Sequence, residues 1–536
     1  MRNTTINPDQ TWRAAWWILG LAVLILAVAI RIRLLGIPLE RDEGEYAYAG
    51  QLMLQGIPPY KLAYNMKFPG TYAAYAVMMS IFGQTANGIH LGLLMVNAAS
   101  IALVFFLGRR LMNATAGIVA AASYAVLSVN PSVLGFAGHA THFVILPVLG
   151  GCLLLLRSLD RPSTKILFVA GLLFGIGLLM KQPAFFFILF GASYLFYRDC
   201  RAGLSWKQRI LRNAVFNCGA VLPFGITCFL LWRANVFAKF WFWTIDYARQ
   251  YAGLVSVFDG GKILIHNLPL VIASDWPLWA LAGLGLMVLV WDNRMRTSAG
   301  FLVGLLVFSM LAICPGLYFR MHYFILVLPA FSLLAGAAIA KASSLLSNQI
   351  APIRLIPIVL FGAALSLPIF RERSFFFDLS PVAVCRAIYL GPFPESVRVA
   401  SYIRDHTTAD DLIAVLGSEP QIYFYSNRHS ASGYIYTYGL MEMQKYANQM
   451  QRDMIREIEL ARPKYLISVV MNDSWLKQSG SNQLIFTWAN NYAAQNYTVV
   501  GFVNMVTPDR TDYYFGSIPP SVPVLRDYIL IYERKS

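Results

Sequence analysis

The chain has 536 residues, of which 57% are hydrophobic and only 13% are charged, and its formal net charge is +16. Average soluble domains are about 45–50% apolar and about 25% charged, so this composition excludes a protein that is soluble throughout. Residues 1–370 hold 27 Lys and Arg against 11 Asp and Glu, whereas residues 371–536 hold 16 of each class. Because membrane proteins keep basic residues in cytoplasmic loops, this distribution indicates membrane topology and speaks against a nucleic-acid partner.

Residues 1–370 contain eleven stretches that are apolar enough to cross a bilayer, which needs about 20 mainly apolar residues. They are 14–36, 89–108, 114–131, 140–157, 165–180, 183–197, 213–233, 275–291, 299–315, 323–340 and 353–370. The first has no small-residue cleavage site and is predicted to be a retained anchor. The run 69–83 is shorter and follows Pro69-Gly70, so it is predicted to be a juxtamembrane or re-entrant helix.

The basic residues orient these spans. With the N-terminus in the cytoplasm, the inner side receives the Arg-rich loops, including 198–212, whereas counting 69–83 as a span would place those loops outside. This orientation puts 37–88, 234–274 and 371–536 on the outer side, which in a bacterium is the periplasmic side of the inner membrane. The aromatic and charged stretch 237–251 is predicted to be an interfacial amphipathic helix.

Residues 371–536 change character. Strands are predicted at 412–416, 464–470, 497–506 and 527–532, with helices at 395–407 and 439–460. This alternation predicts a small extracytoplasmic α/β domain after a membrane domain that spans 1–370. No GxGxxG, P-loop or HExxH motif occurs, and the six cysteines include no CxxC pair, so nucleotide-driven chemistry and cysteine-ligated zinc lack their usual signatures.

An acidic cluster, Glu40-Arg41-Asp42-Glu43-Gly44-Glu45-Tyr46, follows the first span. A carboxylate that is partly desolvated at the membrane boundary becomes a better base, and adjacent Asp42 and Glu43 could hold a hard divalent cation. The competing interpretation is a helix start, where acidic residues interact favourably with the helix dipole. Similarly, Glu419-Pro420-Gln421 follows a predicted strand where α/β folds often bind ligands, although a helix start is favoured there.

Several cations and histidines belong to the outer side of the membrane domain. Lys67, Lys181 and Arg320 together could neutralise a lipid phosphate, although each alone is more typical of a snorkelling or interfacial anchor. His139 and His142 lie three residues apart, a spacing that suits a proton relay or a metal site. An interfacial pair without function is the more common situation.

Four groups of residues carry a resemblance to a known class. They are Arg41–Ala49 after the first span, Lys67-Phe68-Pro69-Gly70 with the run to Phe82-Gly83, Leu107–Leu111 after the second span, and Arg320, His322 and Tyr323 leading into Leu326–Pro329. In order and spacing they resemble membrane glycosyltransferases of the GT-C fold, specifically the bacterial relatives of protein O-mannosyltransferases and of the transferases that add aminoarabinose to lipid A. The resemblance covers most of residues 1–370.

The resemblance implies transfer of a sugar from a polyprenyl-phosphate donor to a lipid, glycan or protein acceptor. Asp42 would be the principal catalytic carboxylate, and Glu43 would assist or help to hold a divalent metal cation. Lys67, Arg320 and Lys181 would bind the donor phosphate, where positive charge stabilises the leaving group. The residues that would position the acceptor or the substrate are Tyr46, His139, His142, His322 and Tyr323.

The chain departs from the family pattern at two places. Many relatives carry an acidic residue beside the lysine, where this chain has Met66 and Phe68. Some carry another acid in the second outer loop, where this chain has His139-Ala140-Thr141-His142, so a histidine could replace the missing acid.

Two other classes compete with an enzyme. A transporter or lipid flippase would also have many spans, but such proteins tend to show internal repeats and helices broken near the bilayer midplane, and neither is seen in the sequence. A non-enzymatic envelope scaffold would use residues 371–536 to bind its partners.

Overall fold

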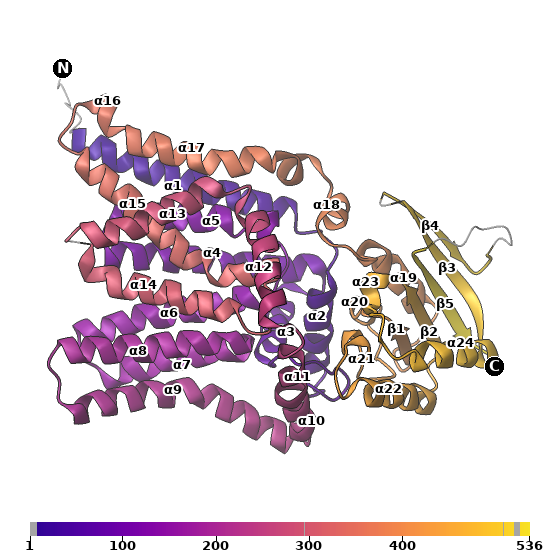
Figure 1. Ribbon diagram of the computed structural model, residues 1–536. Coiled ribbons are helices and arrows are strands. Elements are labelled where there is room, and N and C mark those ends of the chain that lie inside the picture. Colours follow the sequence, from indigo (N-terminus) through magenta and orange to yellow (C-terminus); the bar gives the residue numbers. More distant parts are fainter. Residues whose placement is uncertain (1–7, 294, 508, 519–525, 536) are drawn as a thin grey trace. The chain divides into compact units, whose positions relative to one another are not determined.

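A computed structural model describes residues 8–293, 295–507, 509–518 and 526–535 (Figure 1). The chain divides into two compact units. The helical unit comprises Met1–Leu34, His90–Thr227 and Val255–Asp378, and the mixed unit comprises Leu35–Ile89, Cys228–Leu254 and Leu379–Ser536. The segment Leu35–Ile89, which follows the first expected span, therefore groups with the C-terminal region. The expected domain division at residue 370 stays a prediction.

Each of the eleven expected spans forms a helix. These helices are α1 (Pro8–Arg33), α4 (Ala86–Leu111), α5 (Ala114–Leu127), α6 (Ala140–Asp160), α7 (Thr164–Met180), α8 (Phe185–Arg201), α9 (Trp206–Arg233), α13 (Trp276–Trp291), α14 (Arg296–Ile313), α15 (Leu328–Leu345) and α17 (Ile356–Arg371). The predicted fold class, a polytopic helical membrane bundle followed by a small sheet domain, is confirmed.

Seven stretches within the described residues are helices that are long and apolar enough to cross a membrane on their own. They are Ala14–Arg33, Ala86–Leu111, Ala140–Asp160, Trp206–Arg233, Arg296–Ile313, Leu328–Leu345 and Pro352–Arg371. Three more of the expected spans, α5, α7 and α13, are shorter apolar helices. The chain is therefore a multi-pass membrane protein, and the number eleven stays a prediction.

Local sequence sets the ends and contacts of these helices. Asn113 begins α5 by accepting a hydrogen bond from the backbone N–H of Ala116, and Ser163 begins α7 in the same way. Gly108 of α4 lies so close to Gly117 of α5 that an added Cβ would approach its Cα to 2.8 Å. Small residues thus allow neighbouring helices to touch, as is typical of membrane bundles.

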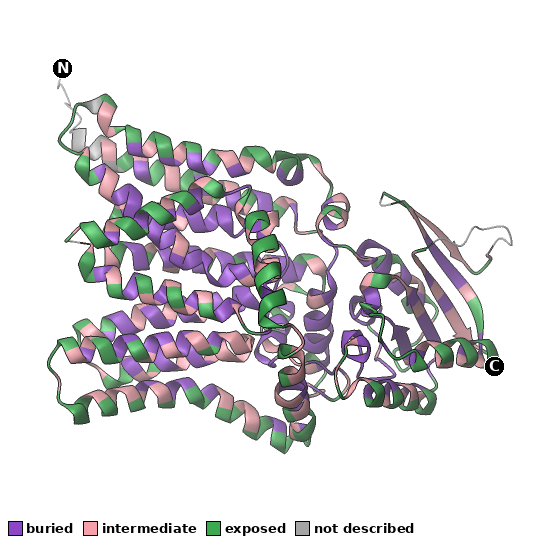
Figure 2. Cartoon of the chain, viewed as in Figure 1, coloured by how far each residue is buried: buried purple, intermediate pink, exposed green. Residues whose placement is uncertain are grey.

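The segment 234–274 contains more helix than the sequence suggested. The predicted helix at 237–251 is present as α10 (Phe237–Trp241), the π-helical turn η3 (Phe242–Tyr247) and α11 (Ala248–Ala252). A further helix, α12 (Val257–Ile272), was not predicted. Much of α12 is exposed (Figure 2), including apolar side chains such as Val257, Phe258 and Ile265.

Among its described residues, the mixed unit contains a five-stranded sheet in the order β1-β2-β5-β3-β4. The strands are β1 (Ile413–Leu416), β2 (Tyr465–Val470), β3 (Tyr497–Thr507), β4 (Arg510–Phe515) and β5 (Tyr528–Arg534). Strands β1 and β2 are parallel, and the other pairs are antiparallel. All four predicted strands are confirmed, and β4 is an additional edge strand.

The helices of the mixed unit around this sheet differ in part from the prediction. They are α18 (Pro381–Ile388), α19 (Phe393–Asp405), α20 (Gln421–Ser426), α21 (Tyr438–Met441), α22 (Ala447–Ala461), α23 (Asn472–Trp475) and α24 (Leu484–Asn496). The predicted helix 395–407 corresponds to α19. The predicted helix 439–460 is instead divided between α21 and α22.

Helix α2 (Arg41–Leu54) carries the acidic cluster and lies against both the C-terminal region and α3 (Gly70–Phe82). An added Cβ at Gly44 would come within 2.7 Å of the backbone nitrogen of Gln421, at the start of α20. Glycine is therefore what allows α2 to approach the C-terminal region closely. Helix α3 has 13 residues, which agrees with the prediction of a helix too short to span.

Candidate active site

Two of the four acidic residues in the acidic cluster, Glu40 and Glu43, cap the start of α2. The Glu40 carboxylate accepts a hydrogen bond of 2.9 Å from the backbone N–H of Glu43, and the Glu43 carboxylate accepts one of 3.5 Å from that of Glu40. This reciprocal capping box satisfies amide groups that would otherwise lack a partner. The helix-start interpretation is therefore right for Glu40 and Glu43, whose carboxylates bond the helix backbone.

Asp42 and Glu45 are the other two acidic residues of the cluster. They lie three residues apart on α2, a spacing that places both side chains on one face. Lys67 bridges them, with its Nζ atom 2.8 Å from Asp42 Oδ1 and 2.8 Å from Glu45 Oε2. The side chains of Asp42 and Lys67 are 17% and 19% exposed, whereas that of Glu45 is 1% exposed. We call Asp42, Glu45, Lys67 and the side chains that contact them the carboxylate cluster. Within it, Asp42 and Lys67 are exposed enough for a substrate to reach.

Neighbouring donors fix the buried carboxylate. The Tyr72 hydroxyl donates to Glu45 Oε1 at 2.6 Å, and the Asn65 amide donates to Glu45 Oε2 at 2.7 Å. The Tyr60 hydroxyl donates to the backbone carbonyl of Lys67 at 2.7 Å, which holds the lysine backbone in place. Hydrogen bonds to a charged group are stronger than neutral ones, so Glu45 is a firm anchor for Lys67.

Two tyrosines flank the cluster. The Lys67 Nζ atom lies 4.6 Å from the ring centre of Tyr46 and 5.4 Å from that of Tyr436. An ammonium group close to an aromatic ring is attracted by the ring's negative face. The Tyr436 hydroxyl also donates to Asp42 Oδ1 at 3.4 Å. Tyr46, predicted to position a substrate, thus lies beside the predicted phosphate-binding lysine.

The electrostatics follow from burial and from these contacts. Burial raises the pKa of Glu45, although Lys67 opposes the shift. Burial alone would lower the pKa of Lys67, but Asp42 and Glu45 outweigh it and the pKa is raised. Burial also raises the pKa of Tyr46 and of Tyr436, so both hydroxyls stay protonated as donors. Lys67 therefore stays charged beside the carboxyl groups of Asp42 and Glu45.

Arg41 attaches α2 to the C-terminal region through a buried network. Its Nη2 atom lies 2.9 Å from Glu419 Oε1, and its Nε–H donates to the backbone carbonyl of Ser418 at 2.6 Å. A further hydrogen bond joins it to the Tyr438 hydroxyl, and its guanidinium lies over the rings of Phe393 and Tyr438. The favoured helix start at Glu419-Pro420-Gln421 is confirmed, because α20 begins at Gln421.

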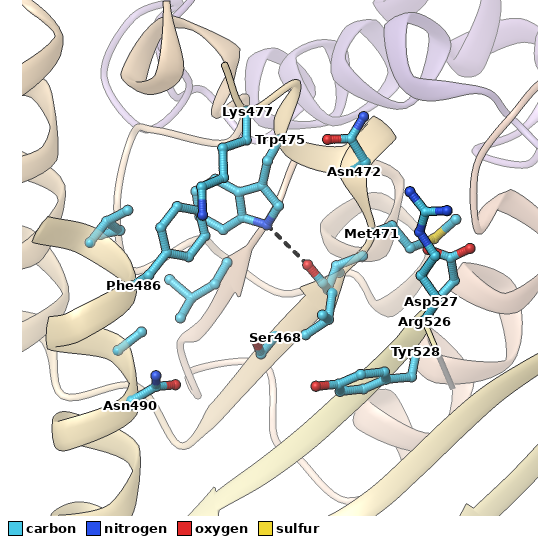
Figure 3. A pocket seen from close by; sticks show the side chains of 15 residues that line it. Ser468, Met471, Asn472, Trp475, Lys477, Phe486, Asn490, Arg526, Asp527 and Tyr528 are labelled. Atoms are coloured by element: carbon cyan, nitrogen blue, oxygen red, sulfur yellow. Dashed lines mark hydrogen bonds between the residues drawn. The ribbon is translucent and has the colours of Figure 1, made fainter. Parts of the chain in front are cut away.

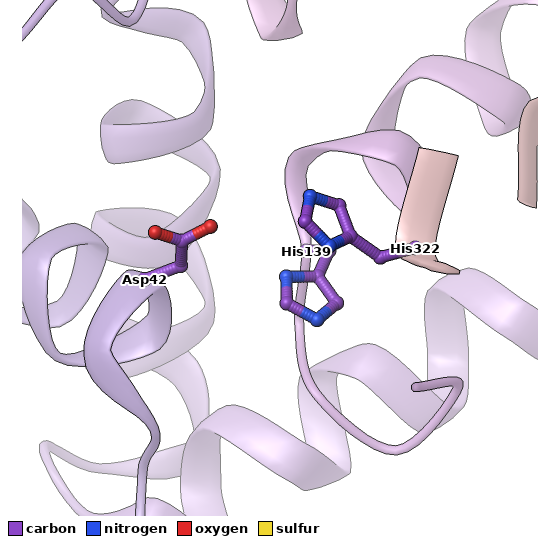
Figure 4. Close-up of side chains that lie close together, drawn as sticks. All are labelled: Asp42, His139 and His322. Carbon is purple, nitrogen blue, oxygen red and sulfur yellow. The ribbon is translucent and has the colours of Figure 1, made fainter. Parts of the chain in front are cut away.

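The remaining predicted residues belong to the helical unit. The His139 and His322 rings stack with their centres 4.1 Å apart and an interplanar angle of 15° (Figure 4). The Tyr323 ring lies edge-on to His322 at 4.8 Å, and the Lys181 Nζ atom is 3.9 Å from the centre of the Tyr323 ring. The structure thus gathers four predicted residues from three separate segments into one histidine cluster.

Two predicted residues have other neighbours. His142 Nδ1 lies 3.4 Å from the Asn97 amide nitrogen, and the Asn97 amide oxygen accepts a hydrogen bond from Ser128. His142 therefore contacts α4, although it is only three residues from His139. The Arg320 guanidinium lies 5.5 Å from the ring centre of Tyr318.

Sequence reasoning missed four residues of the carboxylate cluster: Glu45, Asn65, Tyr72 and Tyr436. Glu45 had a usable signal, since it lies three residues after Asp42 in a predicted helix start. It also supplies an acidic partner for Lys67, whose immediate neighbours Met66 and Phe68 are not acidic. Tyr436 gave no local signal, because its contact with Asp42 joins residues 394 positions apart.

Comparison with known proteins supports the same class. The profile of the dolichyl-phosphate-mannose-protein mannosyltransferase family matches residues 67–232. Among curated proteins, none matches the sequence with significance.

Solved structures show the same fold at low sequence identity. ArnT from Cupriavidus metallidurans bound to undecaprenyl phosphate is 15% identical with a TM-score of 0.56, and the match covers 96% of this chain and 98% of that one. The oligosaccharyltransferase AglB from Archaeoglobus fulgidus, in complex with an inhibitory peptide and a dolichol-phosphate, is 14% identical with a TM-score of 0.53. That match covers 94% of this chain and 75% of AglB. An AglB complex with Zn and sulfate is 16% identical with a TM-score of 0.52, covering 93% of this chain and 74% of that one.

The resemblance seen in the sequence is confirmed by these matches. The chain is a polytopic membrane protein with the fold of the GT-C glycosyltransferases. Its fold neighbours include a structure bound to a polyprenyl phosphate and others bound to peptides.

Proposed function

We propose that the protein transfers a sugar from a polyprenyl-phosphate-linked donor to an acceptor of the bacterial envelope, with Asp42 as the principal catalytic carboxylate. The observation that carries this proposal is the cluster of Asp42, Lys67 and Glu45. Asp42 is partly exposed and pairs with Lys67, which in turn pairs with the buried Glu45. The lipid phosphate bound to ArnT and the family description support a donor of this class. The lipid donor also accounts for the absence of a nucleotide-binding motif from the sequence.

The proposed reaction is a single displacement. The acceptor hydroxyl gives its proton to the Asp42 carboxylate while its oxygen forms a bond to the anomeric carbon of the donor sugar. The bond between that carbon and the phosphate oxygen breaks, and its electron pair leaves with the polyprenyl phosphate. A positioned carboxylate of this kind typically contributes about 10²–10⁴-fold to the rate.

The cations stabilise the leaving group in this proposal. An ammonium has three N–H donors, and in the structure two of those of Lys67 serve Asp42 and Glu45. The third can meet a phosphate oxygen, and the resemblance assigns Lys181 and Arg320 to the same task. Donors aimed at the developing negative charge are usually the largest single contribution to such catalysis.

A divalent cation is a further part of the proposal. The resemblance assigns such an ion to Asp42. Separately, within the helical unit, the stacked imidazoles of His139 and His322 are nitrogen ligands that divalent ions accept. Glu43, which the sequence paired with Asp42 for this task, bonds the helix backbone instead. Dialysis against EDTA followed by addition of Mg²⁺, Mn²⁺ or Zn²⁺ measures whether turnover needs a metal.

The proposed orientation places the N-terminus in the cytoplasm and residues 371–536 in the periplasm of the bacterial inner membrane. Labelling of S479C with a membrane-impermeant maleimide tests it, in a background whose six native cysteines have been replaced. Ser479 is exposed, and we expect labelling in intact spheroplasts. Labelling only after membrane disruption would place the sheet on the cytoplasmic side.

The activity itself is tested by reconstitution. Purified protein in liposomes, given a polyprenyl-phosphate sugar and an envelope extract as acceptor source, should release polyprenyl phosphate and label the acceptor in equal amounts. Movement of the intact donor across the bilayer without release would instead favour a flippase. Neither release nor movement with any donor would favour the scaffold.

A further inference from the structure

The C-terminal sheet carries a cavity that the proposed reaction does not use. It has a volume of about 440 Å³ and lies in the mixed unit, where the parallel strands β1 and β2 end (Figure 3). Ligands of α/β folds characteristically bind outside the carboxyl ends of parallel strands. The volume is within the range of about 300–1,000 Å³ that is typical of sites for small ligands.

Aromatic rings form the walls of this cavity. Trp475 packs against Phe486 with ring centres 4.6 Å apart, and its indole N–H donates to the carbonyl of Val469 at 3.0 Å, which fixes the ring. Tyr528 lies on the opposite side (Figure 3). The walls are therefore rigid and largely apolar, and they can contact the C–H faces of a ring-shaped ligand.

Neutral polar groups complete the lining. Ser468 on β2, Asn472 on α23, Asn490 on α24 and the Tyr528 hydroxyl all border the cavity. In the part of the chain that the structure describes, none of these four side chains makes a hydrogen bond of its own. Asn472 and Asn490 are exposed at the rim, so their amides are accessible to a ligand.

The chemistry of these groups points to one class of ligand. Hydroxyl and amide side chains both donate and accept hydrogen bonds, as do the hydroxyl groups of a sugar. A phosphate would need donors only, and a lipid chain would leave the polar groups without partners. The two cations at the rim, Lys477 and Arg526, are accompanied by Asp527, so the rim is not a strongly cationic site.

We propose that this cavity binds a sugar unit of a glycan acceptor, with aromatic contact from Trp475, Phe486 and Tyr528 and hydrogen bonds from Ser468, Asn472 and Asn490. This assignment rests on the proposed function, because only a transferase has an acceptor whose sugar the cavity could hold. It gives the C-terminal domain a task of its own, which is to hold the glycan part of the acceptor.

Saturation-transfer NMR on the full-length protein tests the assignment. The protein is placed in lipid nanodiscs free of maltoside detergent, since such detergents carry a sugar. The probes are the methyl glycosides of glucose, galactose, mannose, N-acetylglucosamine and galacturonic acid. We expect saturation transfer to at least one glycoside, with about two- to tenfold weaker binding after N490A or Y528F, because each removes a hydrogen bond.

Matched variants make the result specific. N491A changes the next residue of α24, which is exposed and does not line the cavity, and Y514F changes a tyrosine on β4. Both should bind like the unaltered protein. Binding that N490A and Y528F leave unchanged, or no binding of any glycoside, would overturn the proposal.

The failure of this proposal is distinguishable from failure of the proposed function. The D42N variant should bind glycosides normally while losing release of polyprenyl phosphate. If the protein binds glycosides but never releases polyprenyl phosphate, the cavity is still a sugar site and the proposed transferase activity is refuted. Release that depends on Asp42, without glycoside binding, would retain the transferase and remove the cavity.

Discussion

The buried pair Arg41–Glu419 provides the strongest test of how the C-terminal region holds α2. The side chains of Arg41 and Glu419 are 10% and 0% exposed, so E419Q leaves a guanidinium charge in a low-dielectric site with only neutral partners. Removal of one partner of a buried pair typically costs about 3–5 kcal/mol. Since about 1.4 kcal/mol corresponds to a factor of ten, amide hydrogen exchange in α2 should accelerate by about 10²–10⁴-fold if it proceeds by local opening.

The control and the double variant separate the ion pair from simple loss of a side chain. E459Q changes an exposed glutamate on α22 and should alter the free energy of opening by less than about 0.5 kcal/mol. The double variant R41M/E419M replaces both charges by apolar groups and should recover much of the loss. Unchanged exchange in E419Q, or a double variant that loses as much as the two single variants together, would refute the reasoning.

Three further predictions concern charge. Burial and the neighbouring Asp42 and Glu43 raise the pKa of Glu40 from 4.5 to about 8. The contribution of Glu40 to folding stability is therefore complete below pH 4.5 and is lost as the pH rises through 8. E40Q should remove this pH dependence from thermal unfolding curves. K67M should reduce turnover by about tenfold or more, because it removes at least one charge-assisted contact. K445M, which changes an exposed lysine, should leave turnover unchanged. If the stacked histidines hold a metal, H139A should weaken the restoration of activity by Zn²⁺ after EDTA treatment, and equal restoration in both proteins would remove that role.

The sequence was sufficient for the membrane architecture. Apolar length and the distribution of Lys and Arg predicted the helices of the bundle, because lipid requires continuous apolar helices and the charge bias is a property of whole loops. Helix α12 was missed because Asp259, Lys262 and His266 interrupt its apolar pattern. Strand β4 was missed because it lies at the sheet edge and its residues are exposed or half-buried.

The candidate site was predictable only where it is local. Asp42 and Lys67 stand in short motifs, and Glu45 could have been added from helical spacing alone. Tyr436 and Glu419 reach α2 through tertiary contacts across 394 and 378 positions, which no local pattern encodes. The sequence also did not predict that the Glu43 carboxylate accepts a backbone hydrogen bond, because this contact is visible only in the geometry of the helix cap.

Single-turnover release of polyprenyl phosphate by D42N measures whether Asp42 takes the proton of the acceptor, as proposed. D405N serves as the control, because Asp405 is 63% exposed in the same unit. We expect a loss of about 10²–10⁴-fold in the rate for D42N, with an unchanged rate for D405N. Full turnover by a folded D42N protein would show that Asp42 does not take that proton.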